Sequence, residues 1–234
     1  MAKPTGPSPR LGCAPYKRAM DASDPHQGQP ILAIGAPVAE ARAAAILLHG
    51  RGASAEDILS LAEHFIRDAV AYLAPDAAGR TWYPYPFIQP VERNEPYLSS
   101  ALKLIDTIVK SVETQGVPAE RIVILGFSQG ACLTTEYASR NARRYGGIVA
   151  LTGGLIGAQV NRANYRGDFA GTPALLGSSD VDPHIPLARV HETKAVMESL
   201  GAAVDERIYP GMPHTVNADE VAWVKALLER VVRA

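Results

Sequence analysis

Short apolar runs alternate with amphipathic stretches from Ile31 to the end of the chain. Compact apolar runs bounded by Gly, Pro or polar residues are typical of buried strands, whereas apolar residues three and four positions apart are typical of helices. The runs predict strands over residues 43–48, 71–74, 121–125, 148–151, 174–176 and 204–209. The helical spacing predicts helices that start near Ser54 and Pro96 and helices over residues 129–141, 187–200 and 218–232. This alternation favours an α/β fold, a mostly parallel central sheet with helices on both faces.

Local signals place some of the helix ends. Ser54 is expected to cap the first helix with Asp57 as its capping-box partner, and the apolar positions of this helix continue to Ile66 and Ala69. Gly201 is expected to end the helix over residues 187–200, since glycine is favoured just after the last helical turn.

The first 30 residues differ from the rest of the chain. They hold Pro4, Pro7, Pro9, Pro15, Pro25 and Pro30, six of the 18 prolines. Such a segment buries little surface and cannot propagate a helix. We therefore predict a Pro/Gly-rich arm over residues 1–30 and a single domain over residues 31–234. Whether the arm is a plain tail or a ligand for a partner protein stays open.

Charge and composition exclude several classes of function. With 23 Lys and Arg against 24 Asp and Glu, the chain lacks the basic field that a nucleic-acid binder needs. No apolar run approaches the roughly 20 residues that span a bilayer, so stable membrane insertion is not expected. The two cysteines, Cys13 and Cys132, have no metal-ligand spacing, and no metal site is expected. These features favour a protein of a reducing compartment, the cytoplasm.

The sequence Gly126-Phe127-Ser128-Gln129-Gly130 follows directly on the strand predicted to end at residue 125 and opens a helix. A G-x-S-x-G motif in that setting is typical of a nucleophile elbow, in which a tight turn exposes the serine at the edge of the sheet. The bare motif is weak, but its strand-turn-helix setting makes Ser128 the candidate nucleophile.

A serine hydroxyl needs a base, and the base needs an acid that orients it. His214 lies between the last strand and the last helix, where a loop at the carboxyl edge of the sheet is expected, whereas His191 falls inside a helix. The acid should follow the strand over residues 174–176, where Asp180 and Asp182 are available. We favour Asp182, because Pro183 restricts its backbone, and expect Asp180 to stabilise the loop.

An oxyanion hole completes such a site. The backbone N–H of Gln129 should be one donor and that of Arg51, between Gly50 and Gly52, the other. His49 is then expected to hydrogen-bond beneath the hole, beside the substrate, rather than to act as the base.

Four segments in this order resemble the phospholipase/carboxylesterase family of α/β-hydrolases, which includes the acyl-protein thioesterases. They are Leu48-His49-Gly50-Arg51-Gly52, Gly126-Phe127-Ser128-Gln129-Gly130-Ala131, Asp182-Pro183-His184-Ile185-Pro186 and Gly211-Met212-Pro213-His214. The resemblance covers the chain from about residue 31 to its end and implies a triad of Ser128, Asp182 and His214. It also implies ester or thioester hydrolysis without a metal or organic cofactor. Arg51 stands where the eukaryotic thioesterases have an apolar residue. In this respect the chain resembles a bacterial esterase subgroup of the family.

The segment between the strands at residues 148–151 and 174–176 is too short for a separate lid domain. An open pocket is therefore expected, with Trp82, Tyr83 and His184 as substrate contacts, which favours small esters with short acyl or aryl groups. The two aromatic residues can equally form a small core within their own loop. An acyl-protein thioesterase or lysophospholipase, and a non-catalytic small-molecule-binding protein of the same fold, are the alternatives. A homodimer through the loop around Trp82 also stays open.

Overall fold

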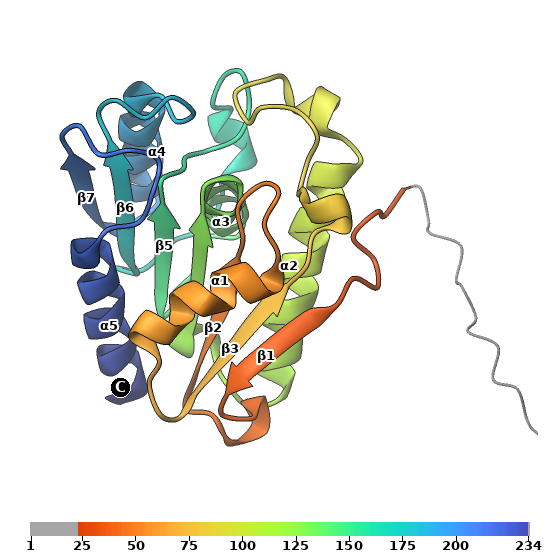
Figure 1. The fold of residues 1–234 in the computed structure, drawn as a ribbon, viewed down its shortest axis with the longest axis vertical. Helices are drawn as coiled ribbons and strands as arrows, with labels where there is room; N and C mark the ends of the chain where they lie inside the picture. Colours follow the sequence, from red (N-terminus) through yellow and green to blue (C-terminus); the bar gives the residue numbers. More distant parts are fainter. Residues whose placement is uncertain (1–22, 234) are drawn as a thin grey trace, which may run out of the picture.

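The structure, a computed structural model, describes residues 23–233 (Figure 1). A single sheet of seven strands runs through it in the order β1-β3-β2-β4-β5-β6-β7. Only β1 is antiparallel to its neighbour, and all the other pairs are parallel. The strands are β1 (Ile31–Gly35), β2 (Ala43–Leu48), β3 (Val70–Pro75), β4 (Ile122–Phe127), β5 (Gly147–Leu151), β6 (Pro173–Ser179) and β7 (Ala203–Tyr209).

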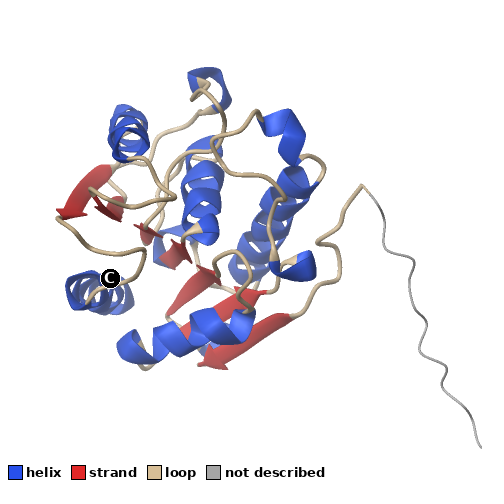
Figure 2. Cartoon of the chain, turned by 45° about the horizontal axis from the view of Figure 1, so that its top comes forward, coloured by secondary structure: helices blue, strands red, loops and turns tan. Residues whose placement is uncertain are grey.

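Five α-helices in residues 23–233 cover the two faces of the sheet (Figures 1 and 2). They are α1 (Ala55–Ala62), α2 (Tyr97–Thr114), α3 (Gln129–Arg140), α4 (Leu187–Ser199) and α5 (Ala218–Arg233). Helices α1 and α5 pack on one face, and α2, α3 and α4 pack on the other. The predicted α/β-hydrolase fold is therefore confirmed, with most element ends within one or two residues of the expected positions.

Strand β2 shows why the central strands are apolar throughout. Ala44, Ile46 and Leu48 belong to the core beneath α2 and α3, while the alternate residues belong to the core beneath α1 and α5. A parallel strand covered on both faces has no polar side, so its sequence is a continuous apolar run. The edge strand β1 is half-exposed along its length, which is why the sequence does not single it out as a strand.

The end of α1 differs from the prediction. The capping box of Ser54 and Asp57 is present, but the α-helix ends at Ala62 and continues only as the 3-10 turn Glu63–Phe65. Ile66 is 41% exposed, so the apolar spacing beyond Phe65 is not a buried helical face. Between β5 and β6, a 3-10 turn at Arg162–Asn164 is the one helical element, and there is no lid domain.

The prediction of an arm over residues 1–30 is wrong near the end of that range, where the chain packs against the domain. His26 is fully buried; its Nδ1 accepts a hydrogen bond from Ala78 N–H at 3.0 Å, and its Nε2–H donates to Trp82 O at 2.9 Å. Asp24 accepts hydrogen bonds from Ser100 and Lys103 on α2. These hydrogen bonds hold part of the proline-rich segment against the domain. Residues 1–22 of the predicted arm lie outside the described residues.

Within residues 23–233, no helix combines the length and the hydropathy needed to cross a bilayer.

Candidate active site

Ser128 lies in the turn between β4 and α3, at the carboxyl edge of the sheet. Its backbone has φ 55° and ψ −116°, a conformation that L-residues rarely adopt. The turn is tight enough that a side chain on Gly126 would overlap the carbonyl of Gly130, and one on Gly130 would overlap the carbonyl of Leu48. Both glycines are therefore required by close backbone approach, and the turn presents the Ser128 hydroxyl above the sheet.

The structure brings Ser128, His214 and Asp182 together from three different loops. His214 Nδ1–H donates to Asp182 Oδ2 at 2.6 Å, and His214 Nε2 lies 2.8 Å from Ser128 Oγ. With Nδ1 protonated toward the carboxylate, Nε2 carries a lone pair that can accept the serine proton. This is the arrangement of an activated serine nucleophile.

The surroundings of Asp182 favour the ionised form of its carboxyl group. Its side chain is fully buried, and its Oδ1 accepts the backbone N–H groups of His184 at 2.8 Å and Ile185 at 2.9 Å. Burial opposes ionisation, but the hydrogen bonds from His214 and these two amides outweigh it and hold the pKa of Asp182 below its ordinary value. Asp180 instead accepts Gly211 N–H at 2.8 Å and so joins its loop to the one that carries His214.

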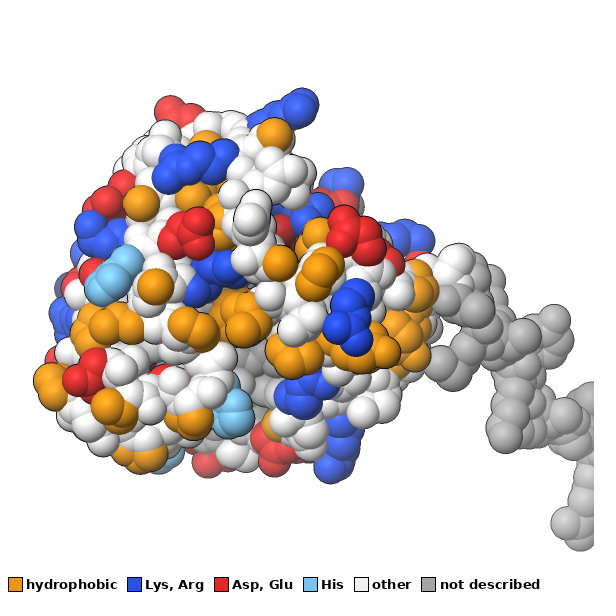
Figure 3. Space-filling view, turned by 90° about the horizontal axis from the view of Figure 1, so that it is seen from above, with side chains coloured by type: hydrophobic (Ala, Val, Ile, Leu, Met, Phe, Trp, Pro, Cys, Tyr) orange, Lys and Arg blue, Asp and Glu red, His pale blue; other side chains and the backbone are white. Residues whose placement is uncertain are grey.

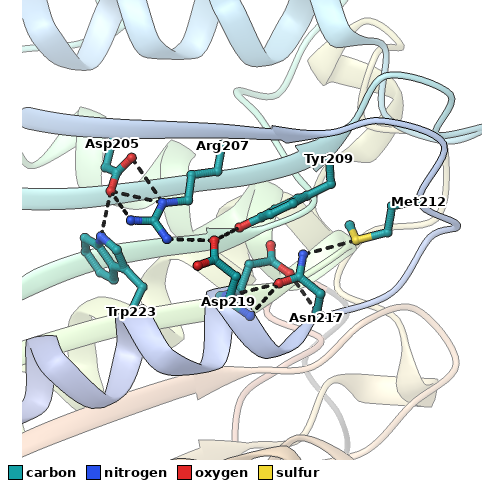
Figure 4. A network of polar contacts seen from close by, with 8 residues as sticks. Asp205, Arg207, Tyr209, Met212, Asn217, Asp219 and Trp223 are labelled. Atoms are coloured by element: carbon teal, nitrogen blue, oxygen red, sulfur yellow. Dashed lines mark hydrogen bonds and ion pairs between the residues drawn. The ribbon is translucent and has the colours of Figure 1, made fainter.

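The far end of the His214 loop is held by the first turn of α5. Asn217 Oδ1 accepts the backbone N–H groups of Asp219 and Glu220, and Glu220 Oε2 accepts Asn217 N–H at 2.9 Å. Asp219 also binds Arg207 and Tyr209 of β7 (Figure 4). The cross-links between β7 and α5 fix the two elements that flank the histidine loop. A reciprocal cap of this kind satisfies amides that the helix itself leaves unpaired.

Glu220 gives a prediction for stability. Its carboxyl is fully buried, and Oε1 has no hydrogen-bond partner among the described residues. Burial, reinforced by Asp219 and opposed by the Asn217 N–H and Arg207, raises the pKa of Glu220 to about 7 from 4.5. The folded state thus holds this proton more tightly than the unfolded state. The resulting stabilisation is full below about pH 4.5 and is lost, by about 3 kcal/mol, as the pH rises through 7.

Glu220→Gln is expected to remove that loss. The free energy of unfolding in urea, measured from about pH 5 to about pH 8, should fall more steeply for the wild type than for the variant. Glu229→Gln, on the exposed side of the same helix, is the control and should parallel the wild type. Parallel curves for all three proteins would show that Glu220 titrates normally.

The turn after β2 orients the second predicted oxyanion donor. His49 Nδ1–H donates to Gly50 O at 2.7 Å, and Nε2 accepts Ala77 N–H at 3.1 Å. A trans peptide directs its C=O and N–H to opposite sides, so the bond to Gly50 O turns the Arg51 N–H away from His49. Burial lowers the pKa of His49 and keeps the ring neutral. Gln129 is the first residue of α3, where an N–H has no partner within the helix.

A cavity of about 560 Å³ adjoins Ser128 and opens on the face seen in Figure 3, where hydrophobic side chains surround the hollow. Cys132, one turn along α3 from Ser128, forms part of its lining, and burial raises the pKa of its thiol to about 12, so the thiol is neutral. The cavity is lined by Gly50, Arg51, Ala53, Tyr83, Pro84, Pro86, Phe87, Phe127, Ser128, Gln129, Cys132, His184, Ile185 and His214.

Two of the four predicted substrate contacts are not at the cavity. Tyr83 and His184 line it, but Trp82 and His49 do not. Trp82 is fully buried, stacks on His49 at 4.9 Å between ring centres and donates Nε1–H to His49 O at 2.9 Å. This correction has a simple cause. The indole packs against the turn over residues 49–52, here called the oxyanion turn because it carries the predicted donor Arg51, and its burial there keeps it out of the cavity lining.

Several lining residues were missed by the sequence analysis. Phe127 adjoins the predicted nucleophile Ser128 and Ile185 adjoins the predicted substrate contact His184, which is a signal that could have found them. Phe87 lies farther along the loop that holds Tyr83. Among residues 23–233, no group of three or more His, Cys, Asp or Glu side chains is placed to hold a metal ion.

A parallel sheet with a strained serine after β4, a histidine after β7 and a carboxylate after β6 defines a serine hydrolase of the α/β-hydrolase fold. Residues 29–232 match the family model for phospholipase/carboxylesterase, and the chain belongs to that family of ester hydrolases. A crystal structure of a phospholipase/carboxylesterase from Dyadobacter fermentans is 48% identical, with a TM-score of 0.84, and the match covers 86% of this chain and 96% of that one.

More distant relatives are acyl-protein thioesterases. Acyl-protein thioesterase 1 of Debaryomyces hansenii is 25% identical over 231 residues, which covers 87% of this chain and 97% of the relative. Acyl-protein thioesterase 1 of Neurospora crassa is 27% identical over 218 residues, with 82% and 87% covered. Both support hydrolysis of ester or thioester bonds as the activity of the family.

Proposed function

We propose that this chain is a carboxylesterase that acts on esters with short acyl or aryl groups through an acyl-enzyme formed on Ser128. The observation that carries the proposal is the continuous hydrogen-bonded line from Ser128 Oγ through the His214 ring to the buried Asp182 carboxylate. An imidazole whose Nδ1–H is held by a carboxylate presents Nε2 toward the serine hydroxyl as the proton acceptor.

In the proposed reaction, His214 Nε2 takes the proton from Ser128 as the hydroxyl oxygen attacks the ester carbonyl. The negative charge on the carbonyl oxygen is stabilised by the backbone N–H groups of Arg51 and Gln129. His214 then gives the proton to the leaving alcohol as the C–O bond breaks. Water repeats the sequence on the acyl-enzyme, releasing the acid and restoring Ser128. Asp182 stabilises the imidazolium and keeps its tautomer throughout.

The cavity supports the choice of a small acyl group. No lid domain within the described part of the chain covers it, and its walls are apolar and aromatic side chains, among them Tyr83 and Phe87 of one loop and Phe127 at the end of β4. Cys132 and Ile185 contribute further to a mainly apolar lining. A short or flat acyl group buries well against such walls and orients its carbonyl toward Ser128.

A series of p-nitrophenyl esters tests this choice. We expect kcat/KM to be highest for acetate or butyrate and to decline through octanoate, laurate and palmitate, because longer chains extend past the walls without gaining contact. A steady rise toward palmitate would contradict the proposal and favour a thioesterase or lysophospholipase. A folded protein inactive on every ester would favour a binding protein.

We further propose that the reaction takes place in the cytoplasm. The neutral, buried thiol of Cys132 is compatible with a reducing compartment. The homodimer stays a prediction that light scattering in solution can test.

A further inference from the structure

The loop over residues 81–87, here called the aromatic loop, contains no α-helix or strand and yet forms one wall of the cavity. A loop without its own ladder of hydrogen bonds must be held by groups from elsewhere in the fold. The shape of this wall is therefore determined by the side chains that form hydrogen bonds to the backbone of the loop.

Arg51 supplies the largest share of these contacts. Its guanidinium donates to the carbonyl oxygens of Pro84 at 2.8 Å, Tyr83 at 3.0 Å and Tyr85 at 3.1 Å. Among residues 23–233, no carboxylate forms an ion pair with Arg51, so its charge is directed at these three carbonyls. Hydrogen bonds from a cation are stronger than neutral ones, and the rigid planar fork of arginine holds several acceptors at once.

Gln129 holds the adjoining part of the same loop. Its Oε1 accepts Trp82 N–H at 2.9 Å, and its Nε2–H donates to Tyr83 O at 2.8 Å. The carbonyl of Tyr83 therefore receives hydrogen bonds from both Arg51 and Gln129. These are the two residues whose backbone N–H groups are proposed to bind the oxyanion, so the cavity wall and the oxyanion donors form one connected unit.

We infer that Arg51 is a specificity-determining residue: its guanidinium fixes the aromatic loop against the oxyanion turn and so limits the length of the acyl group that the cavity accepts. This inference rests on the proposed esterase function. The role of the side chain is separate from that of the Arg51 backbone N–H, which methionine or lysine at this position would retain.

Loss of the guanidinium should loosen the wall without unfolding the protein. The bonds to Pro84 and Tyr85 are exposed, so water can replace the arginine at those carbonyls. Gln129 still holds Trp82 and Tyr83. In the outer part of the loop, Tyr85 keeps the hydrogen bond from its N–H to Asn94 Oδ1 at 2.8 Å, whereas the carbonyl of Pro84 loses its arginine donor. The segment around Pro84, which lines the cavity, is thus the part that gains freedom to move and to admit a longer chain.

The test compares Arg51→Met, Arg51→Lys and Arg42→Met on the ester series from acetate to palmitate. Arg42 is the control, since it is exposed and precedes β2 at the end of that strand opposite to Arg51. For Arg51→Met we expect the ratio of kcat/KM for laurate to that for acetate to rise about tenfold or more, chiefly through a lower KM for laurate. Arg51→Lys, which keeps the charge but not the fork, should shift less, and Arg42→Met should match the wild type.

An unchanged ratio in Arg51→Met would overturn the inference, as would an equal loss on every ester, which would point to damage at the oxyanion hole. If circular dichroism shows that Arg51→Met does not fold, Arg51→Lys tests the inference instead, through its ratio of kcat/KM for laurate to that for acetate. A wild type without Ser128-dependent activity would instead reject the esterase function itself.

Discussion

Ser128→Ala is expected to lower kcat for ester hydrolysis by roughly 10⁴- to 10⁶-fold. The reason is that alanine removes the proposed nucleophile beside His214, while the proposed oxyanion donors and the cavity remain and supply a small residual rate. Steady-state hydrolysis of p-nitrophenyl acetate, with the wild type assayed at matched concentration, measures the effect.

Ser60→Ala is the matched control. Ser60 is an exposed serine on α1 whose hydroxyl donates only to Glu56 O within the same helix. We expect Ser60→Ala to keep wild-type activity and both variants to keep wild-type circular dichroism. Activity in Ser128→Ala within tenfold of the wild type would reject Ser128 as the nucleophile.

Asp182→Asn has the second largest expected effect, a loss of about 10⁴-fold in kcat. An amide in place of the carboxylate can no longer stabilise the imidazolium by charge, and its NH₂ group can bind Nδ1 and favour the tautomer that carries its proton on Nε2. That tautomer cannot accept the Ser128 proton. The loss should appear in kcat, with KM little changed, because Asp182 lies behind His214 and does not line the cavity.

Asp180→Asn distinguishes the two carboxylates of this loop. An asparagine at 180 keeps an oxygen that can accept Gly211 N–H, so the His214 loop should stay in place and kcat should fall by only about threefold. If Asp180→Asn were as inactive as Asp182→Asn, the assignment of the acid to Asp182 would be wrong.

Much of the fold could be predicted from the sequence because its signals are local. Continuous apolar runs predict strands buried on both faces, and the capping box at Ser54 marks the start of α1 correctly. The nucleophile turn is also a local feature, since Gly126 and Gly130 are required by backbone contacts that any elbow of this kind makes. The half-exposed strand β1 and the end of α1 were not found, because edge strands and frayed helix ends carry little periodicity.

The candidate triad could be proposed from chain order, because loops that follow parallel strands meet at one edge of the sheet. The distance between His214 and the carboxylate of Asp182 could not be obtained in this way. It depends on the hydrogen bonds of Asp180 to Gly211 and of Glu220 to Asn217, which connect segments from different elements.

The sequence by itself determined the family, the order of the α-helices and of the strands after β1, and the residues that could carry the chemistry. Only the tertiary structure decided that His26 is buried, that Trp82 supports the oxyanion turn instead of facing the cavity, and that the Arg51 guanidinium holds the aromatic loop. The physical reason is the same in each case. Strands and helices satisfy their own backbone groups and so leave a periodic pattern, whereas a loop is satisfied by whichever distant side chains the fold places beside it.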